Sequence, residues 1–292
     1  MTIAVGIGLA FVAMLCWGFG DFLIQRSTRK VGDWETLFII TLFGAIVLAP
    51  FVWHSLPTLF SNGGEPLLVL FVASVVLFIA ALLDLDALKK GKLAIVEPIW
   101  SFEIPAAAVL SFLILGEKVT VLQIVLLIVL MGGLMLVAFR RKRLNKSFLM
   151  EKGIFIALIA AIAMGAANFF MGWGGRVSDP VMVNFFTDAF LAICSGIYLI
   201  AHGRFFKAFT DLKKGYNTLL PMAIADKVAW VAFVFSMVLV PIAVATALSE
   251  SYIIIAILLG LFVNKEKLQG HQKVGLVLAI IGAIVLAVIT SS

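Results

Sequence analysis

The stretch Trp17–Phe22, with the sequence WGFGDF, has a counterpart 147 residues later, MGAANF at Met164–Phe169. A second pair of similar stretches, LGEKV at Leu115–Val119 and NKEKL at Asn264–Leu268, is separated by 149 residues. Similarity at a fixed separation indicates an internal repeat, and the difference of two residues fits one short loop insertion. The sequence therefore predicts a duplicated chain.

The separation of 149 residues also relates Gln123 to Gln272. This match extends the similarity into the last apolar segment of each copy. We place the boundary between the copies after residue 146, which gives a first repeat over 1–146 and a second repeat over 147–292.

The composition is that of a membrane protein. Of the 292 residues, 63% are hydrophobic and only 13% are charged, and the mean hydropathy is +1.17. A helix needs about 20 apolar residues to cross a bilayer core of about 30 Å. Ten apolar runs of suitable length lie near residues 3–24, 34–54, 66–87, 93–115, 119–139, 153–173, 180–201, 217–240, 242–263 and 270–290. The sequence predicts an all-α integral membrane protein with ten transmembrane helices.

Lysine and arginine are distributed unevenly among the loops between these runs. Of the 22 basic residues, 19 fall in odd-numbered loops, whereas Lys118 and Arg176 lie on the other side and Lys227 lies inside a run. The positive-inside rule then places the odd-numbered loops in the cytoplasm and both termini outside. Because this topology and anionic lipid headgroups account for the net charge of +6, no nucleic acid partner is expected.

Each copy contains five of the ten runs. Because five is an odd number, the second copy enters the membrane in the opposite sense. Two repeats of opposite topology, related by a pseudo-twofold axis in the membrane plane, are typical of secondary transporters that bind substrate near the midplane. The sequence thus predicts two inverted five-helix repeats.

Three stretches resemble the EamA repeat of the drug/metabolite transporter (DMT) superfamily: Trp17-Gly18, Gly91-Lys92-Leu93 leading into Pro98, and Leu115-Gly116-Glu117-Lys118. The resemblance covers nearly the whole chain, in both copies. It implies a ten-helix transporter of small metabolites, whose relatives export amino acids or exchange sugar phosphates and nucleotide sugars. The chain departs from the family at Lys265-Glu266, where the family has Gly-Glu, and in its predicted external termini, since the family's termini are usually cytoplasmic. We expect it in the cytoplasmic membrane of a prokaryote.

One of these stretches also resembles a motif of another class of protein. Gly18-Phe19-Gly20-Asp21 resembles the GxGD signature of intramembrane aspartyl proteases, whose chemistry needs two aspartates that share a proton. The second aspartate usually follows a tyrosine, but none of Tyr198, Tyr216 and Tyr252 precedes an aspartate. We therefore expect no enzyme and no catalytic residue. Asp21, near the end of its run, becomes a candidate for gating or cation attraction.

Several acidic side chains lie inside the predicted spans, together with the basic Lys227. A charge at the centre of a span costs about 2.5 to 3.5 kcal/mol on insertion scales, so each carboxylate needs a partner, water or a proton. Lys227 would pair with a carboxylate such as Glu103, Asp188 or Glu250, and the sequence does not choose among them. The candidates for coupling or gating are Asp21, Glu103, Asp188, Asp226 and Lys227.

The fourth run of each copy provides the predicted substrate site. The repeat pairs Glu97 with Thr246 and Ser101 with Glu250, and the two positions in each helix are four residues apart and share a face. Each half would present one carboxylate and one hydroxyl to a central cavity, with Trp100 one turn beyond Glu97. In the alternative interpretation, the hydroxyls bond to their own helix backbone and the acids pair with the buried lysine.

The sequence thus predicts a secondary transporter that works by alternating access, its two halves rocking about a midplane site. An excess of buried acids favours zwitterionic or cationic solutes such as amino acids and favours protons as coupling partners. The resemblance to the EamA repeat implies export as the direction. A passive facilitator and an exchanger of anions such as sugar phosphates or nucleotide sugars remain alternatives. The expected partners are a small-molecule substrate and the lipid bilayer. The histidines and cysteines lack ligand spacing, so neither a metal nor a cofactor is expected.

Overall fold

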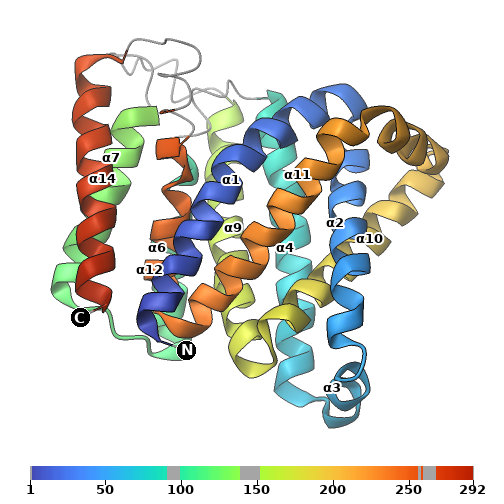
Figure 1. The fold of residues 1–292 in the computed structure, drawn as a ribbon, viewed down its shortest axis with the longest axis horizontal. Coiled ribbons are helices and arrows are strands. Elements are labelled where there is room, and N and C mark those ends of the chain that lie inside the picture. The colour runs from blue at the N-terminus through green and yellow to red at the C-terminus, as the bar shows by residue number, and fades with distance from the viewer. Residues whose placement is uncertain (1, 91–98, 139–151, 256–257, 259–267, 292) are drawn as a thin grey trace.

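The structure is a computed structural model that describes residues 2–90, 99–138, 152–255, 258 and 268–291. Within these residues the chain is helical and contains no strand (Figure 1). The helices of the first copy are α1 (Ile3–Val31), α2 (Asp33–Val52), α3 (Leu56–Asn62), α4 (Gly64–Lys90), α6 (Glu103–Leu115) and α7 (Val121–Ala138). Those of the second copy are α9 (Lys152–Val177), α10 (Pro180–Ala201), α11 (Phe205–Leu239), α12 (Ile242–Glu250) and α14 (Gly270–Ser291).

Seven of these helices are long and apolar enough to cross a membrane: α1, α2, α4, α9, α10, α11 and α14. The predicted fourth, fifth and ninth spans contain the shorter apolar helices α6, α7 and α12. Parts of the fourth and ninth runs lie outside the described residues. The prediction of an all-helical membrane protein is therefore confirmed, whereas the count of ten full spans stays a prediction.

Equivalent helices of the two copies make equivalent contacts. Helix α1 packs on α11 as α9 packs on α4, α1 packs on α12 as α9 packs on α6, and α2 packs on α11 as α10 packs on α4. The pairs α2 with α10, α6 with α12 and α7 with α14 join equivalent helices of the two copies. In Figure 1, α1 rises from the end that carries both termini, whereas α9 descends towards that end. The two-repeat architecture is confirmed, and the second repeat is inverted.

The repeats interlock and do not form separate bodies. Helices α1, α2 and α11 contact one another and α12 contacts α1 and α11, and we call this group bundle A. Helices α4, α6, α9 and α10 form the equivalent group, bundle B. The bundles meet where α2 packs on α10, α6 on α12, and α11 on both α9 and α10, while α7 and α14 form a pair at one side (Figure 1). Each bundle therefore takes two helices from each repeat.

Two glycines at equivalent positions of the repeat allow neighbouring helices to approach closely. An added Cβ at Gly18 of α1 would lie 2.7 Å from the Cβ of Ile255, which follows α12. An added Cβ at Gly165 of α9 would lie 2.6 Å from the Cβ of Ala106 in α6. Gly165 is 147 residues after Gly18 and Ile255 is 149 residues after Ala106. In each bundle, a glycine is thus required where the first helix of one repeat (α1 or α9) crosses the fourth predicted span of the other repeat, which contains α12 or α6.

The glutamines paired by the repeat perform the same task in both copies. The Oε1 atom of Gln123 accepts a hydrogen bond of 2.9 Å from the Thr120 backbone N–H, and its Nε2 donates to Thr290 Oγ1 at 3.1 Å. Gln272 accepts from the Gln269 backbone N–H at 3.0 Å and donates to the Val137 carbonyl at 2.9 Å. Each glutamine satisfies a backbone group at the start of its own helix and then ties that helix to the end of the other.

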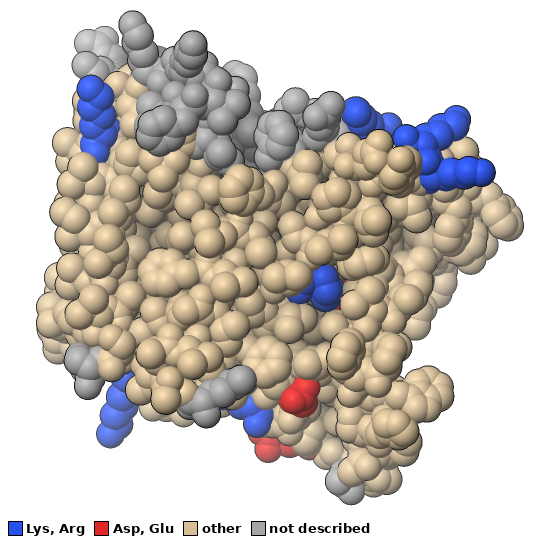
Figure 2. All heavy atoms as spheres, viewed as in Figure 1, with Lys and Arg blue, Asp and Glu red and all other residues tan. Residues whose placement is uncertain are grey.

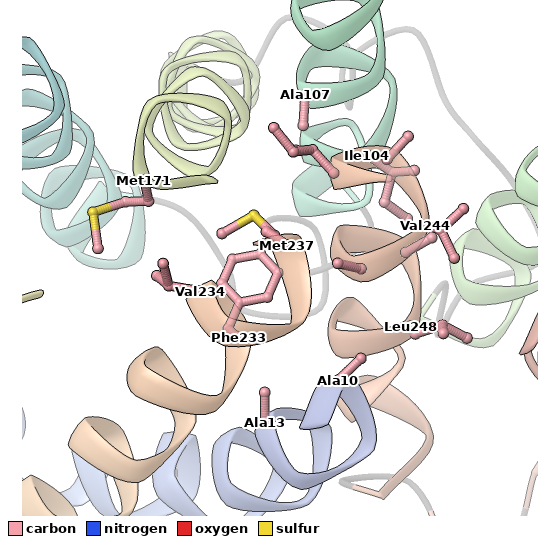
Figure 3. Packing of buried hydrophobic residues seen from close by; sticks show 14 of the residues in the cluster. Ala10, Ala13, Ile104, Ala107, Met171, Phe233, Val234, Met237, Val244 and Leu248 are labelled. Atoms are coloured by element: carbon pink, nitrogen blue, oxygen red, sulfur yellow. The ribbon is translucent and has the colours of Figure 1, made fainter. Parts of the chain in front are cut away.

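The centre of the molecule is filled by side chains from both bundles. In Figure 3, Ala10 of α1, Phe233 and Met237 of α11, Val244 of α12 and Ile104 of α6 lie in one packed cluster. The small alanine lets α1 approach its neighbours closely. The face shown in Figure 2 carries a wide belt that is nearly free of charged side chains, and most visible Lys and Arg atoms lie along the edge opposite the termini. The belt matches the hydrocarbon region of a bilayer.

Neighbouring glycines in α7 provide a test of the packing between α7 and α14. An added Cβ at Gly133 would lie 2.7 Å from the Ala279 backbone nitrogen, whereas one at Gly132 would meet nothing within 4 Å. We expect Gly133→Ala to lower the free energy of unfolding by about 1 to 3 kcal/mol, because backbone atoms cannot move aside cheaply. Gly132→Ala is the matched control and should be neutral or stabilising by up to about 1 kcal/mol, since alanine favours helix. Denaturation in detergent measures both; equal effects would contradict the packing.

Candidate functional site

The most buried charged contact joins the two bundles. The Nζ atom of Lys227 in α11 forms an ion pair with the Oδ2 atom of Asp188 in α10. The Lys227 side chain is only 6% exposed and the Asp188 side chain 9%. Of the three partners that the sequence leaves open for Lys227, the structure selects Asp188. Each charge neutralises the other where water cannot do so.

The position of Asp188 follows from the way α10 begins. The Oδ1 atom of Asp179 accepts hydrogen bonds from the backbone N–H groups of Val181 at 2.7 Å and Met182 at 3.2 Å, which caps the helix. Pro180 occupies the first turn, where its missing N–H costs nothing. The buried face of α10 then includes Asn184, Thr187, Asp188, Leu191 and Ser195. Asp188 lies on this helical stripe, near the middle of α10.

A glycine in α2 makes room for the ion pair. A Cβ atom added at Gly44 would overlap both the Asp188 Oδ2 atom and the Lys227 Cε atom. Helices α2, α10 and α11 therefore meet at the ion pair, and α2 contributes a glycine, which has no side chain, at this point. No local sequence pattern indicates the role of Gly44, because that role arises from contacts between distant segments.

Asp226 adds a second carboxylate beside the pair. It is adjacent to Lys227 in α11, so the two side chains point about 100° apart around the helix. Asp226 is only 8% exposed, and its side chain makes neither a hydrogen bond nor an ion pair with another described residue. The cluster of Asp188, Asp226 and Lys227 therefore holds two acids and one base in the membrane-spanning part of the chain.

Glu103 has a different neighbour. Its Oε2 atom accepts a hydrogen bond of 3.2 Å from the Nδ2 atom of Asn168, so it connects α6 to α9 inside bundle B. Both residues are buried. In the repeat, Asn168 corresponds to Asp21 and Glu103 to Tyr252. The backbone of Asp21 lies in α1, but its side chain lies outside the described part of the structure, so its predicted role is untested.

The predicted substrate residues are only partly described. Glu97 lies outside the described residues, and Ser101 is buried just before α6. Thr246 and Glu250 are buried in α12, and the Thr246 hydroxyl has no hydrogen-bond partner among the described residues. Trp100 packs with Ile99 against Ala87 of α4 and Ala157 of α9, while its indole N–H is buried without a described partner. Whether these residues form one site stays a prediction.

The ion pair has no equivalent at the related position in the other half. At the separations of 147 and 149 residues, Asp188 corresponds to Thr41 and Lys227 to Phe78. Phe78 instead packs against the rings of Trp34, at 6.2 Å between centroids, and Phe190, at 6.3 Å. One junction between the bundles is thus charged and the related junction is aromatic.

Comparisons with known proteins agree with the fold. The sequence profile of the EamA-like transporter family matches residues 4–139 and 151–288. A solved structure described only as "Crystal structure of protein" superimposes with a TM-score of 0.75 at 16% sequence identity, covering 98% of this chain and 97% of that chain. At this identity the likeness concerns the fold alone. No curated protein matches the sequence.

Removing one member of the ion pair tests its contribution to stability. We expect Lys227→Met to lower the free energy of unfolding by about 3 to 5 kcal/mol, because it leaves the Asp188 charge buried without its partner. The double variant Asp188→Leu, Lys227→Met should recover most of this loss. Lys214→Met, at an exposed position of the same helix, is the matched control and should have little effect. Denaturation in detergent measures all three. A double variant no more stable than Lys227→Met would contradict the pairing.

Proposed function

Because the chain belongs to the EamA-like transporter family, we propose that it is a secondary transporter that moves small metabolites by alternating access across the cytoplasmic membrane of a prokaryote. The members of this family are membrane transporters, not enzymes. The observation that carries the mechanism is the ion pair between Asp188 and Lys227, because it joins α10 of bundle B to α11 of bundle A inside the membrane-spanning region. A contact at this place must change if the bundles move.

The moving bodies in this proposal are the two bundles. Rocking of the sequence repeats against each other would break the extensive contacts of α1 with α11 and of α4 with α9, since each pair contains one helix from each repeat. Motion of bundle A against bundle B preserves these contacts. The contact of α2 with α10 lies between the bundles and is also extensive, so it would act as the hinge, while the smaller contacts of α6 with α12 and of α11 with α9 would open and close.

The substrate class follows from the charges in the membrane-spanning region. The buried acids Glu103, Asp188, Asp226 and Glu250 outnumber the base Lys227. A zwitterionic or cationic solute such as an amino acid would place its ammonium group near a carboxylate and its own carboxylate near Lys227. We propose export as the direction, as the family resemblance implies.

Proton coupling is proposed at the same cluster. A proton that binds Asp188 removes one charge of the ion pair and weakens the link between the bundles. When Asp188 is neutral, Asp226 is the remaining carboxylate of the cluster, and it would pair with Lys227 after a change in the rotamers of both side chains. Protonation would thereby favour the state in which the bundles separate at this junction.

Lys227 also supports an alternative substrate class. A buried lysine can hold a phosphate or carboxylate as a point charge, so an exchanger of sugar phosphates or nucleotide sugars is the second candidate. A passive facilitator would share the architecture and lack the coupling. Counterflow and the response to a proton gradient separate these three possibilities.

The test is transport in proteoliposomes loaded with candidate amino acids, polyamines or sugar phosphates. We expect counterflow of a zwitterionic or cationic solute, accelerated by a proton gradient, and a loss of at least about tenfold in Asp188→Asn and Lys227→Gln. Lys214→Gln, the exposed control, should retain the wild-type rate. Counterflow of phosphates alone would favour the anion exchanger. Transport that ignores the gradient and survives in Asp188→Asn would refute the coupling.

A further inference from the structure

A second link between the bundles lies at the end of the molecule that carries both termini. Arg176, in the last turn of α9, donates from Nε and Nη2 to the Met237 carbonyl at 2.9 and 2.6 Å. Its Nη2 also donates to the Val240 carbonyl at 3.2 Å. These carbonyls are at the C-terminal end of α11, where a positive charge is favoured. Arg176 of bundle B therefore caps a helix of bundle A.

Glu117 completes this link from the first repeat. Its Oε1 atom lies 2.5 Å from the Nη2 atom of Arg176, and its Oε2 atom accepts a hydrogen bond of 3.0 Å from the backbone N–H of Ile242. Ile242 begins α12, and a carboxylate there satisfies a free N–H group and complements the helix dipole. Gly116, with a φ of +64°, ends α6 and turns the chain so that Glu117 reaches α12. Glu117 belongs to the LGEK stretch of the repeat.

The backbone around this link is tightly packed. An added Cβ at Gly172 of α9 would lie 2.9 Å from Ile242 Cδ1, and one at Gly175 would lie 2.6 Å from Val234 Cγ1 of α11. Close packing holds α9 against the junction of α11 and α12. The same junction is where bundle B meets bundle A at this end of the membrane.

The two charged links between the bundles differ in exposure. The Arg176 and Glu117 side chains are 26% and 12% exposed, against 6% for Lys227 and 9% for Asp188. Partial exposure lets water replace the bonds when they break, so this link costs less to open than the buried pair. An ordered yet reversible contact is what a transporter needs at the entrance that it closes.

We infer that Glu117 and Arg176 form a latch that closes the transporter at the end carrying the termini, and that it opens in each transport cycle. This inference rests on the proposed function, because it assigns one step of alternating access to named residues. In this role Glu117 of the LGEK stretch positions the end of bundle B on bundle A.

Spin labels at Thr2, before α1 of bundle A, and Ser61, in α3, which contacts α4 of bundle B, measure the separation of the bundles at this end; both positions are exposed. The labels are attached in a background where Cys16 and Cys194 are replaced by alanine. We expect Arg176→Gln to increase the population with the longer distance roughly tenfold, as the loss of charge-assisted hydrogen bonds implies. Arg176→Lys, which keeps the charge but loses the fork, and Glu117→Gln should give smaller increases.

Glu35→Gln is the matched control. Glu35 forms an ion pair of 2.6 Å with Arg204 at the opposite end of the membrane, so its loss should not lengthen the Thr2–Ser61 distance. A wild-type distance distribution in folded Arg176→Lys and Glu117→Gln would overturn the latch. A Glu35→Gln variant that lengthens the distance equally would also overturn it, because the effect would then be one of general destabilisation.

A disulfide provides an independent test. An added Cβ at Gly175 would lie 3.2 Å from Val238 Cγ2, so Gly175→Cys with Val238→Cys can bridge α9 and α11 beside the latch once Val234→Ala removes the Cγ1 atom that would lie 2.6 Å from that Cβ. In this variant the spin labels are carried on non-canonical side chains, so that they do not react with the two introduced thiols. Oxidation should abolish the longer distance in the Arg176→Gln protein, and reduction should restore it. A long distance that persists after oxidation would show that this junction is not where the end opens. The distance measurements need no substrate, so they test the latch separately from the proposed function. Absence of transport would refute the proposed function, whereas only the distances can refute the contact between the bundles at this end.

Discussion

The structure depends on one constraint: a charge inside a bilayer must be neutralised by a partner that reaches it. Lys227 and Asp188 satisfy this requirement together, but only because α10 and α11 are adjacent and α2 presents Gly44 beside them. The pair therefore fixes the register of three helices. A protein that needed only stability would gain as much from apolar side chains at these positions, so retaining the charges suits a contact that must also break.

Inverted duplication determines where such contacts can occur. Because each bundle takes helices from both repeats, every contact of α2 with α10 or of α6 with α12 lies between bundles. The latch formed by Glu117 and Arg176 closes this boundary at one end, and the buried pair spans it in the membrane. The related junction around Phe78 is aromatic, so among the described residues the ion pair of Asp188 and Lys227 has no counterpart there. In the proposed coupling, a proton acts at the charged junction and not at the aromatic one.

Much of the fold could be predicted from the sequence, because a bilayer imposes helix length and the repeat separations fix which helices are equivalent. The matched contacts of Gly18 with Ile255 and Gly165 with Ala106 show how faithfully those separations describe the packing. The site was less accessible to prediction. Lys227 and its possible partners were identifiable by burial, but the choice of Asp188 depends on helix neighbours that no local pattern specifies, and Gly44 matters only through atoms 144 and 183 residues away in sequence. From the sequence, Arg176 indicates only topology, because its acceptors are backbone carbonyls, which no side-chain pattern reveals.

In the proposed mechanism the bundles, and not the sequence repeats, are the moving bodies. Fluorescent pairs in lipid nanodiscs can distinguish them at the level of single molecules. Thr2 and Val238 belong to different repeats and one bundle, whereas Thr2 and Leu68 belong to one repeat and different bundles; all three are exposed. We predict a constant Thr2–Val238 distance and a Thr2–Leu68 distance that switches between two values. A switching Thr2–Val238 distance with a constant Thr2–Leu68 distance would contradict the account.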